Sequence, residues 1–375
     1  MRTAPEVITL EDLGIVRVHG VDAVRFLQGQ LSNDVARVST ANSLLAGYHN
    51  PQGRTIALLR LVQWDADDIL AVVPRELAGV VAARLGKFVL RAKVEVADES
   101  AAWRVAGLVD SAADGTGERG AADAGGAADT VQPASAPAAA DTTNAAATPT
   151  SSRARGEDAS VSTLADGSRP RELPLSVGGQ ARGVGAVFVC VGDRPLRWLI
   201  ISPAGGVSPL SSYPVGDRQT WLRLDIAAGQ PQVNAATSEE FVAQMLNLDV
   251  LNAIAFDKGC YTGQEVIARA HYRGKVKRRM QRFVSRDACH LAPGDSGQLA
   301  DGRAFKVVLA AQLADGRCDF LAVATLVGAG RDDAVAATQA IPPAAPPVAD
   351  SPASGALAPV TLIAEQVSLP YCLPD

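Results

Sequence analysis

Residues 257–265 read Asp-Lys-Gly-Cys-Tyr-Thr-Gly-Gln-Glu, and they form the most informative stretch of this 375-residue chain. Thr262 followed three residues later by Glu265 is the pattern of a capping box, so we expect a helix to begin there. The apolar spacing that follows favours a helix reaching His271 or Tyr272, and Gly274 is a typical stop. Cys260 would then lie two residues before the helix cap.

Cys260 is a candidate reactive thiol in this arrangement. The start of a helix carries unpaired N–H groups and the positive end of the helix dipole, and Lys258 adds a full positive charge. These conditions favour a thiolate. The alternative interpretation is a buried and inert cysteine that fills a tight turn, because free cysteine is a common core residue.

A run of basic residues follows the same stretch, with few acids among them. Its members are Arg269, Arg273, Lys275, Lys277, Arg278, Arg279, Arg282 and Arg286. In a chain of net charge −5 this run predicts a local anion site, such as a groove for a polyglutamate tail or an RNA strand. A solvated helix face followed by an exposed strand is the alternative. The acidic balance of the whole chain argues against general nucleic-acid binding.

Cysteine usage and hydropathy limit the class of protein. The 5 cysteines are widely spread, and no pair has the spacing of a zinc or iron–sulfur ligand set, so we expect reduced thiols and no metal site. The first 13 residues lack the apolar core of a signal peptide. No apolar run approaches the roughly 18 residues that span a bilayer. We therefore expect a soluble, cytoplasmic protein without a membrane partner. Nucleotide-binding loops and hydrolase nucleophile motifs are also missing from the sequence.

Composition divides the chain into ordered blocks and two biased segments. Residues 112–182 and 331–358 consist mainly of Ala, Pro, Gly and small polar residues. Such segments bury too little apolar surface to offset an ordering entropy of about 1–2 kcal/mol per residue. We expect both to be disordered insertions.

The remaining blocks combine strand-like and helix-like patterns, which predicts an α+β fold. Residues 238–251 have the apolar spacing of a helix. The expected strands are Ile15–Val18, Ile56–Val62, Ile69–Val73, Ala186–Val191, Trp198–Ser202, Phe283–Val284, Phe305–Ala310, Phe320–Leu326 and Val360–Ile363. The last four suggest a small β-rich final domain interrupted by the second insertion.

Lys258–Glu265 resembles the signature K-G-C-Y-[TI]-G-Q-E of YgfZ-type proteins, which share the fold of the glycine-cleavage T-protein. Four other segments are similar to family patterns: Phe26–Val35, Pro51–Arg54, Asp225–Pro231 and Leu369–Tyr371. The resemblance implies a ring of three domains around a central folate channel, with a C-terminal β-barrel. It assigns residues 1–110 and 183–280 to folate-binding domains, the first of them discontinuous. Residues 281–330 and 359–375 would form the barrel.

The same resemblance implies a site for tetrahydrofolate or a related folate. Trp221 would stack on the folate, with ordinary core packing as the alternative role. Lys258, Arg269 and Arg273 would attract its glutamate carboxylates, and Asp225 and Gln264 complete the cofactor-binding candidates. Two departures stand out: Ala227 replaces a glutamate that reads the pterin ring in T-proteins, and Leu13 replaces a tryptophan found in some relatives. Asp225 is the carboxylate that could take over from the missing glutamate.

The resemblance implies a folate-binding accessory protein that supports assembly or repair of iron–sulfur enzymes, including those that thiolate tRNA. Its expected partners are folate and either iron–sulfur enzymes or their assembly factors. A folate-dependent aminomethyl or one-carbon transferase is the first alternative, which requires a carboxylate at the folate nitrogen; Asp34 is the nearest candidate. An RNA-binding accessory module is the second alternative, but few aromatic residues, Tyr272 among them, are interleaved in the basic run.

Overall fold

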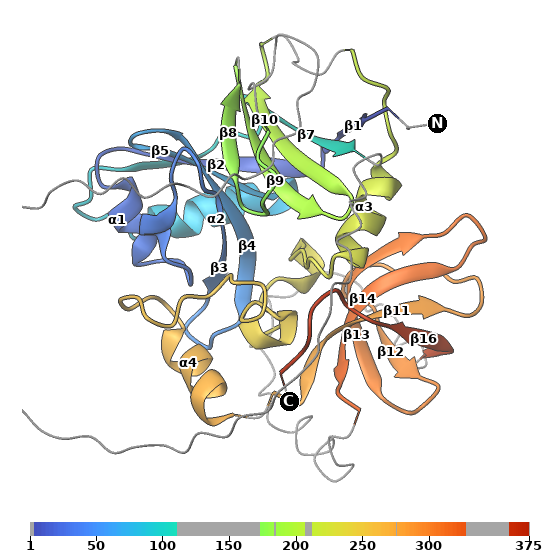
Figure 1. Cartoon of the computed structure of the whole chain (residues 1–375). Coiled ribbons are helices and arrows are strands. Elements are labelled where there is room, and N and C mark those ends of the chain that lie inside the picture. Colours follow the sequence, from blue (N-terminus) through green and yellow to red (C-terminus); the bar gives the residue numbers. More distant parts are fainter. Residues whose placement is uncertain are drawn as a thin grey trace, which may run out of the picture.

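The computed structural model describes residues 4–110, 173–183, 185–206, 212–274, 276–327 and 360–374. The expected insertion at 331–358 lies outside the described residues, as does the greater part of the one at 112–182. Figure 1 shows three bodies, namely a blue sheet with its helices, a green sheet and an orange barrel. Sheets and helices are mixed along the chain, which confirms the predicted α+β class. No helix in the described ranges is long and apolar enough to cross a lipid bilayer.

The first sheet has the strand order β3-β4-β5-β2-β6, and its strands pair antiparallel. The strands are β2 (Leu13–His19), β3 (Leu44–His49), β4 (Thr55–Asp65), β5 (Asp68–Pro74) and β6 (Glu95–Asp98). Apolar runs predicted three of them correctly. Helix α1 (Ala23–Gln28) and the 3-10 turn η1 (Val35–Arg37) follow β2, and α2 (Arg75–Gly86) buries Leu77, Val81 and Leu85. Leu59 and Leu61 of β4 belong to the same buried cluster, which places the main core between this sheet and its helices.

The second sheet combines strands from both sides of the first biased segment. Its order is β1-β7-β10-β9-β8. The strands are β1 (Glu6–Thr9), β7 (Trp103–Asp110), β8 (Gln180–Gly183), β9 (Ala186–Asp193) and β10 (Leu196–Pro203). The predicted hairpin is β9–β10, and every residue from Ala186 to Val191 is buried.

The expected end of the first insertion was wrong by about ten residues. Residues 173–182 were assigned to it, yet Leu173 is buried and Gln180 begins strand β8. The carbonyl of Pro174 accepts a hydrogen bond from the Trp198 indole at 2.7 Å, and the Gln180 side chain donates to Gln63 O at 2.7 Å. Polar composition concealed this strand because its contacts are mainly hydrogen bonds rather than apolar packing.

The helix expected over residues 238–251 is not formed. The segment contains only a 3-10 helix, η4 (Ala243–Leu246), because Glu239 and Asn247 have φ angles of 64° and 58°. A left-handed residue at either place ends a right-handed helix. Two longer helices and another 3-10 turn occur nearby, namely α3 (Arg218–Ala227), α4 (Gln264–Arg273) and η3 (Ala235–Thr237). Figure 1 places α3 between the green sheet and the orange barrel.

The C-terminal sheet curls into a nearly closed barrel, as predicted. Its order is β15-β12-β13-β14-β11-β16. The strands are β11 (Arg278–Ser285), β12 (Ser296–Leu299), β13 (Ala304–Gln312), β14 (Cys318–Thr325), β15 (Val360–Leu362) and β16 (Ala364–Val367). Only Ile363 separates β15 from β16. Because β15 pairs with β12 and β16 pairs with β11, one short segment is hydrogen-bonded to both ends of the β12–β13–β14–β11 sheet. This connection brings the two edges together.

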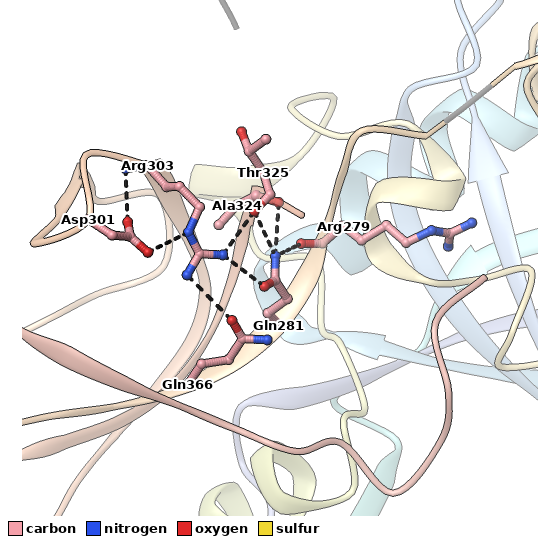
Figure 2. A network of polar contacts seen from close by, with 7 residues as sticks. All are labelled: Arg279, Gln281, Asp301, Arg303, Ala324, Thr325 and Gln366. Carbon is pink, nitrogen blue, oxygen red and sulfur yellow. Dashed lines mark hydrogen bonds and ion pairs between the residues drawn. The ribbon is translucent and has the colours of Figure 1, made fainter. Parts of the chain in front are cut away.

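Arg303 holds one end of this barrel together (Figure 2). Its guanidinium donates to the Thr325 carbonyl at 2.9 Å, to Gln281 Oε1 at 3.2 Å and to Gln366 Oε1 at 3.4 Å. It also pairs with Asp301 across an Asp-Gly-Arg turn. One side chain thus joins the turn before β13 to β14, β11 and β16.

Arg303→Met should lower the free energy of unfolding by about 1–3 kcal/mol, because acceptors on three strands lose a charged donor. Chemical denaturation measures the loss. Arg317→Met is the matched control, since Arg317 occupies an equivalent Asp-Gly-Arg turn, pairs with Asp315 and is 41% exposed, against 16% for Arg303. We expect its effect to stay within about 0.5 kcal/mol. Equal losses in the two variants would show that the barrel contacts of Arg303 add nothing.

Candidate functional site

Lys258 anchors the 257–265 segment to the end of α1. Its ammonium group donates three hydrogen bonds, to the carbonyl oxygens of Gln28 at 2.7 Å, Leu31 at 2.7 Å and Asn33 at 2.8 Å. Burial lowers the pKa of Lys258 to about 8, and nearby Asp34 opposes that shift. All three N–H donors of the ammonium are therefore used inside the protein. The expected role of Lys258 in attracting ligand carboxylates has no free donor to support it.

Helix α4 begins one residue later than expected, and the predicted capping box is not formed. Gly263, not Thr262, is the N-cap, and no side chain caps the helix. Gly263 has a φ of +81°, and a Cβ there would lie 2.5 Å from the carbonyl oxygen of Asn50. This close approach joins the start of α4 to the Pro51–Arg54 turn, so packing rather than capping determines where the helix begins. The predicted stop at Gly274 is confirmed, because Gly274 is the C-cap, and α4 ends at Arg273, one residue beyond Tyr272.

Cys260 is exposed, which excludes the buried, inert interpretation. The cysteine lies three residues before the true N-cap, and the Lys258 charge points toward the end of α1. The neighbouring Tyr261 is buried, and burial raises its pKa to about 12. Within the described residues, Cys260 lines neither of the hollows defined below.

The predicted basic run does not form one surface. Arg279 is buried and pairs with Asp249 at 2.9 Å, and Arg282 pairs with Asp319 at 2.8 Å. Burial lowers the pKa of Arg278. Arg269 and Arg273 are exposed on α4, and Lys275 lies outside the described residues. The basic residues on β11 thus form ion pairs within the fold, whereas those on α4 are exposed.

An inner hollow of about 280 Å³ lies where the two sheets, α3 and the barrel meet. Its apolar lining includes Leu13, Leu45, Leu58, Val72, Val191, Leu199, Trp221, Leu222, Leu309 and Ala310. Leu13 therefore faces the hollow, whereas Ala227 is not among its lining residues. An apolar hollow with a few polar groups is the usual form of a small-molecule site.

Trp221 and Asp225 occupy the same side of the inner hollow, one turn apart on α3. The indole is 3% exposed and lies so close to β7 that a Cβ on Gly107 would be 2.3 Å from it. The Asp225 carboxylate accepts a hydrogen bond from Arg197 through Oδ1. These two predicted residues are brought together by the fold.

Arg218 and Asp12 form a second charged pair at the inner hollow. Arg218 donates to Asp12 through Nε at 2.9 Å and through Nη2 at 2.6 Å. The carboxylate raises the pKa of Arg218, while the guanidinium lowers the pKa of Asp12; burial opposes both shifts. Arg218 Nη1 is buried without an acceptor among the described residues. That atom is a buried donor whose hydrogen-bonding capacity is unused by the described residues.

An outer hollow of about 820 Å³ adjoins the inner one. Its lining includes Asn33 of the Phe26–Val35 segment, Val177, Gly178 and Leu251–Asp257 without Ala253. Leu45, Arg60 and Gln230 line both hollows, which makes them neighbouring parts of one cavity system. Tyr272 of α4 lines the outer hollow, whereas Gln264, Arg269 and Arg273 do not.

Of the residues that line the inner hollow, sequence reasoning named Trp221 and Asp225 but not Arg60, Arg218 and Asp12. A usable signal existed for Arg60, which is the single charged residue within the apolar run Ile56–Val62. Leu58 and Arg60 are two residues apart on β4 and line the same hollow. Leu59 and Leu61 are fully buried in the main core, as strand alternation requires. No comparable pattern marked Asp12 or Arg218.

Two curated proteins with similar sequences carry the name "tRNA-modifying protein YgfZ". The chain is 28% identical to that of Pectobacterium carotovorum subsp. carotovorum over 316 residues, which is 82% of this chain and 80% of the relative. It is 29% identical to that of Pectobacterium atrosepticum over 317 residues, with the same coverage of 82% and 80%. No protein-family model matches the chain. The predicted YgfZ-type resemblance is confirmed.

The predicted T-protein-like fold is also confirmed. The glycine cleavage system aminomethyltransferase T from Bartonella henselae superimposes with a TM-score of 0.59 at 14% identity. The match covers 86% of this chain and 79% of that structure. A likeness at this identity concerns the fold alone, because unrelated functions share folds. The segment Lys258–Glu265, which resembles the YgfZ-type signature, thus spans the loop before α4 and the first two residues of that helix, on a T-protein-like framework.

Lys258→Met should lower the free energy of unfolding by about 2–4 kcal/mol, because three backbone carbonyls lose their donors together. Urea denaturation gives the value. Lys306→Met is the matched control, because Lys306 pairs with the 43% exposed Glu240 and should contribute at most about 1 kcal/mol. If Lys258→Met unfolds like the wild type yet loses affinity for folate, the lysine acts on the ligand after all.

Proposed function

We propose that this chain is a folate-binding accessory protein of tRNA modification. In that role it would support the assembly or repair of iron–sulfur enzymes, including those that thiolate tRNA. The observation that carries the proposal is the inner hollow, with Trp221 and Asp225 together on α3. The names of the YgfZ relatives support the connection to tRNA modification.

The inner hollow has the polar groups that a pterin ring requires. A pterin is a flat aromatic ring system with N–H donors on one edge and a carbonyl oxygen beside them. Asp225 uses Oδ1 for Arg197, so its second oxygen can accept hydrogen bonds from the ring N–H groups. Arg218 Nη1 can donate to the ring oxygen or nitrogen. The Trp221 indole supplies apolar surface for the ring.

A transferase needs, in addition, a carboxylate that is free to act on the folate nitrogen. Asp34, the candidate from the sequence, accepts a hydrogen bond from the Gln28 amide at 2.9 Å and lines neither hollow. Asp12 and Asp225 are the acids lining the inner hollow, and each is paired with an arginine. Turnover of a dihydrolipoyl-amine substrate that depends on formaldehyde would establish the transferase instead.

An RNA-binding role has one favourable observation. Tyr272 is 68% exposed on α4, between the exposed residues His271 and Arg273. Phe256 stacks on the His271 ring at a centroid distance of 3.8 Å, which fixes this aromatic group in place. RNA binding that weakens steeply between about 50 and 200 mM salt would support this role.

Folate binding is tested by calorimetry with tetrahydrofolate. The wild type should bind in the micromolar range, and Trp221→Ala should weaken binding by about tenfold to a hundredfold through lost contact with the ring. Trp64→Ala is the control, because Trp64 packs against Trp103 and does not line either hollow. Wild-type affinity no better than about millimolar would exclude the cofactor.

The cellular role is tested separately in a deletion strain. Thiolated nucleosides in tRNA and the activities of iron–sulfur enzymes should both fall, and the wild-type gene should restore them. Trp221→Ala should fail to restore them if folate binding serves that role. Unchanged thiolated nucleosides after deletion would contradict the accessory function while leaving the calorimetric result intact.

A further inference from the structure

Two cysteines meet at the end of the barrel opposite Arg303. Cys289 lies in the loop between β11 and β12, and Cys318 is the first residue of β14, so β12 and β13 separate them along the chain. The Cys318 thiol donates a hydrogen bond to the carbonyl oxygen of Cys289 at 3.1 Å. The two thiol groups also lie within hydrogen-bonding distance of each other, and burial together with this contact raises the pKa of Cys318 to about 11.

Backbone hydrogen bonds hold this thiol pair in place from both sides. The Cys289 N–H donates to the Gly316 carbonyl at 3.1 Å. The Gln312 amide donates to the carbonyls of both residues, at 3.0 Å to Cys289 and 2.9 Å to Gly316. The Cys318 N–H donates to Oγ of Ser285, the last residue of β11, at 2.8 Å. Because both cysteines are already fixed in contact, a sulfur–sulfur bond between them needs little movement of the backbone.

The two thiols differ in their access to solvent. Cys318 is 1% exposed and belongs to the core of the barrel, whereas Cys289 is half-buried at its edge. A dissolved oxidant therefore reaches Cys289 first, and Cys318 is placed to react with Cys289 rather than with solvent. An accessible thiol beside a second, resolving thiol is a common arrangement in redox-sensitive proteins.

We propose that Cys289 and Cys318 form a reversible disulfide when the protein meets a hydroperoxide. With hydrogen peroxide, the Cys289 sulfur attacks one peroxide oxygen, the O–O bond breaks, and the thiol proton leaves with the other oxygen as water. The product is a sulfenic acid at Cys289. The Cys318 sulfur then attacks the sulfenic sulfur, and its proton leaves with the departing hydroxide as a second water. One peroxide is reduced for each disulfide formed, and a dithiol reductant reverses the change.

The disulfide would act on the part of the barrel that faces the inner hollow. Pro293 lies in the same loop as Cys289 and lines that hollow, as do Leu309 and Ala310 of β13. The bond would enclose β12 and β13 in one covalent loop, so it would hold this wall of the hollow together. The proposal does not depend on the folate function, because it concerns the barrel alone.

Peptide mass spectrometry of the full chain tests the proposal. The parent protein for this test carries Cys260→Ser and Cys372→Ser, which remove the two exposed thiols and leave Cys190, Cys289 and Cys318. A brief treatment with hydrogen peroxide should lower its thiol count from three to one. The digest should contain a peptide that links Cys289 to Cys318 and lacks two hydrogen atoms, and dithiothreitol should restore all three thiols.

Three further substitutions in this parent assign the roles of the cysteines. Cys318→Ala should leave a sulfenic acid at Cys289 that dimedone captures, because the resolving thiol is missing. Cys289→Ser should keep the other two thiols reduced, because both are buried. Cys190→Ala is the matched control, since this buried thiol donates to the Gly192 carbonyl, and it should leave the link unchanged. The linked peptide is measured in the parent, so it decides the proposal even if Cys318→Ala does not fold.

Thermal unfolding provides a second measurement. The oxidised parent should melt about 5–10 °C above the reduced one, because the bond restricts the unfolded chain across β12 and β13, and Cys289→Ser should show no such difference. A lower or unchanged melting temperature after oxidation would show that the bond distorts the barrel, and would overturn the proposal. Three intact thiols after treatment, or a link that contains Cys190, would overturn it as well.

Discussion

The three hydrogen bonds of the Lys258 ammonium are the constraint on which the cavity system depends. They hold the loop before α4 against the carbonyl groups at the end of α1, although more than two hundred residues separate the two segments. Asn33 strengthens the same junction, because its amide donates to Leu45 O and to Asn252 O at 2.7 Å each. Each segment contributes a lining residue to the outer hollow, namely Asn33 and Asp257. Without this junction the hollow would lose one of its sides.

The side chains that line the cavity come from strands that also form the hydrophobic core. β4 contributes Leu58 and Arg60 to one face, while its other face fills the main core with Leu59 and Leu61. The alternation of a strand thus lets one apolar run serve both stability and binding. Arg60, the charged residue of this apolar run, is partly exposed and lines both hollows.

The barrel contributes to the same cavity from the opposite side, through Leu309 and Ala310 of β13. Its closure depends on the single segment that forms both β15 and β16, and on Arg303 at the open end. Tyr371, beyond β16, donates to the Gly229 carbonyl at 2.8 Å, just after α3. The C-terminal segment therefore fixes the position of the helix that carries Trp221 and Asp225.

The sequence by itself determined the fold class, most of the strands, the end of α4 and the YgfZ-type resemblance. These features depend on local apolar periodicity and on short motifs, which are visible within a window of ten to twenty residues. The family resemblance also named Trp221 and Asp225, which the fold places at the same hollow. It failed at the start of α4, over residues 238–251 and at strand β8, where close packing, left-handed residues and hydrogen bonds outweigh local preference.

Only the tertiary structure decided which charges are available to a ligand. Lys258 looked like a free cation but uses every donor on backbone carbonyls, whereas Arg60, within an apolar strand run, lines both hollows. The basic run likewise divided into buried ion pairs on β11 and exposed residues on α4. A charge acquires its role from the partners that surround it in space, and those partners come from segments that lie far apart in the chain.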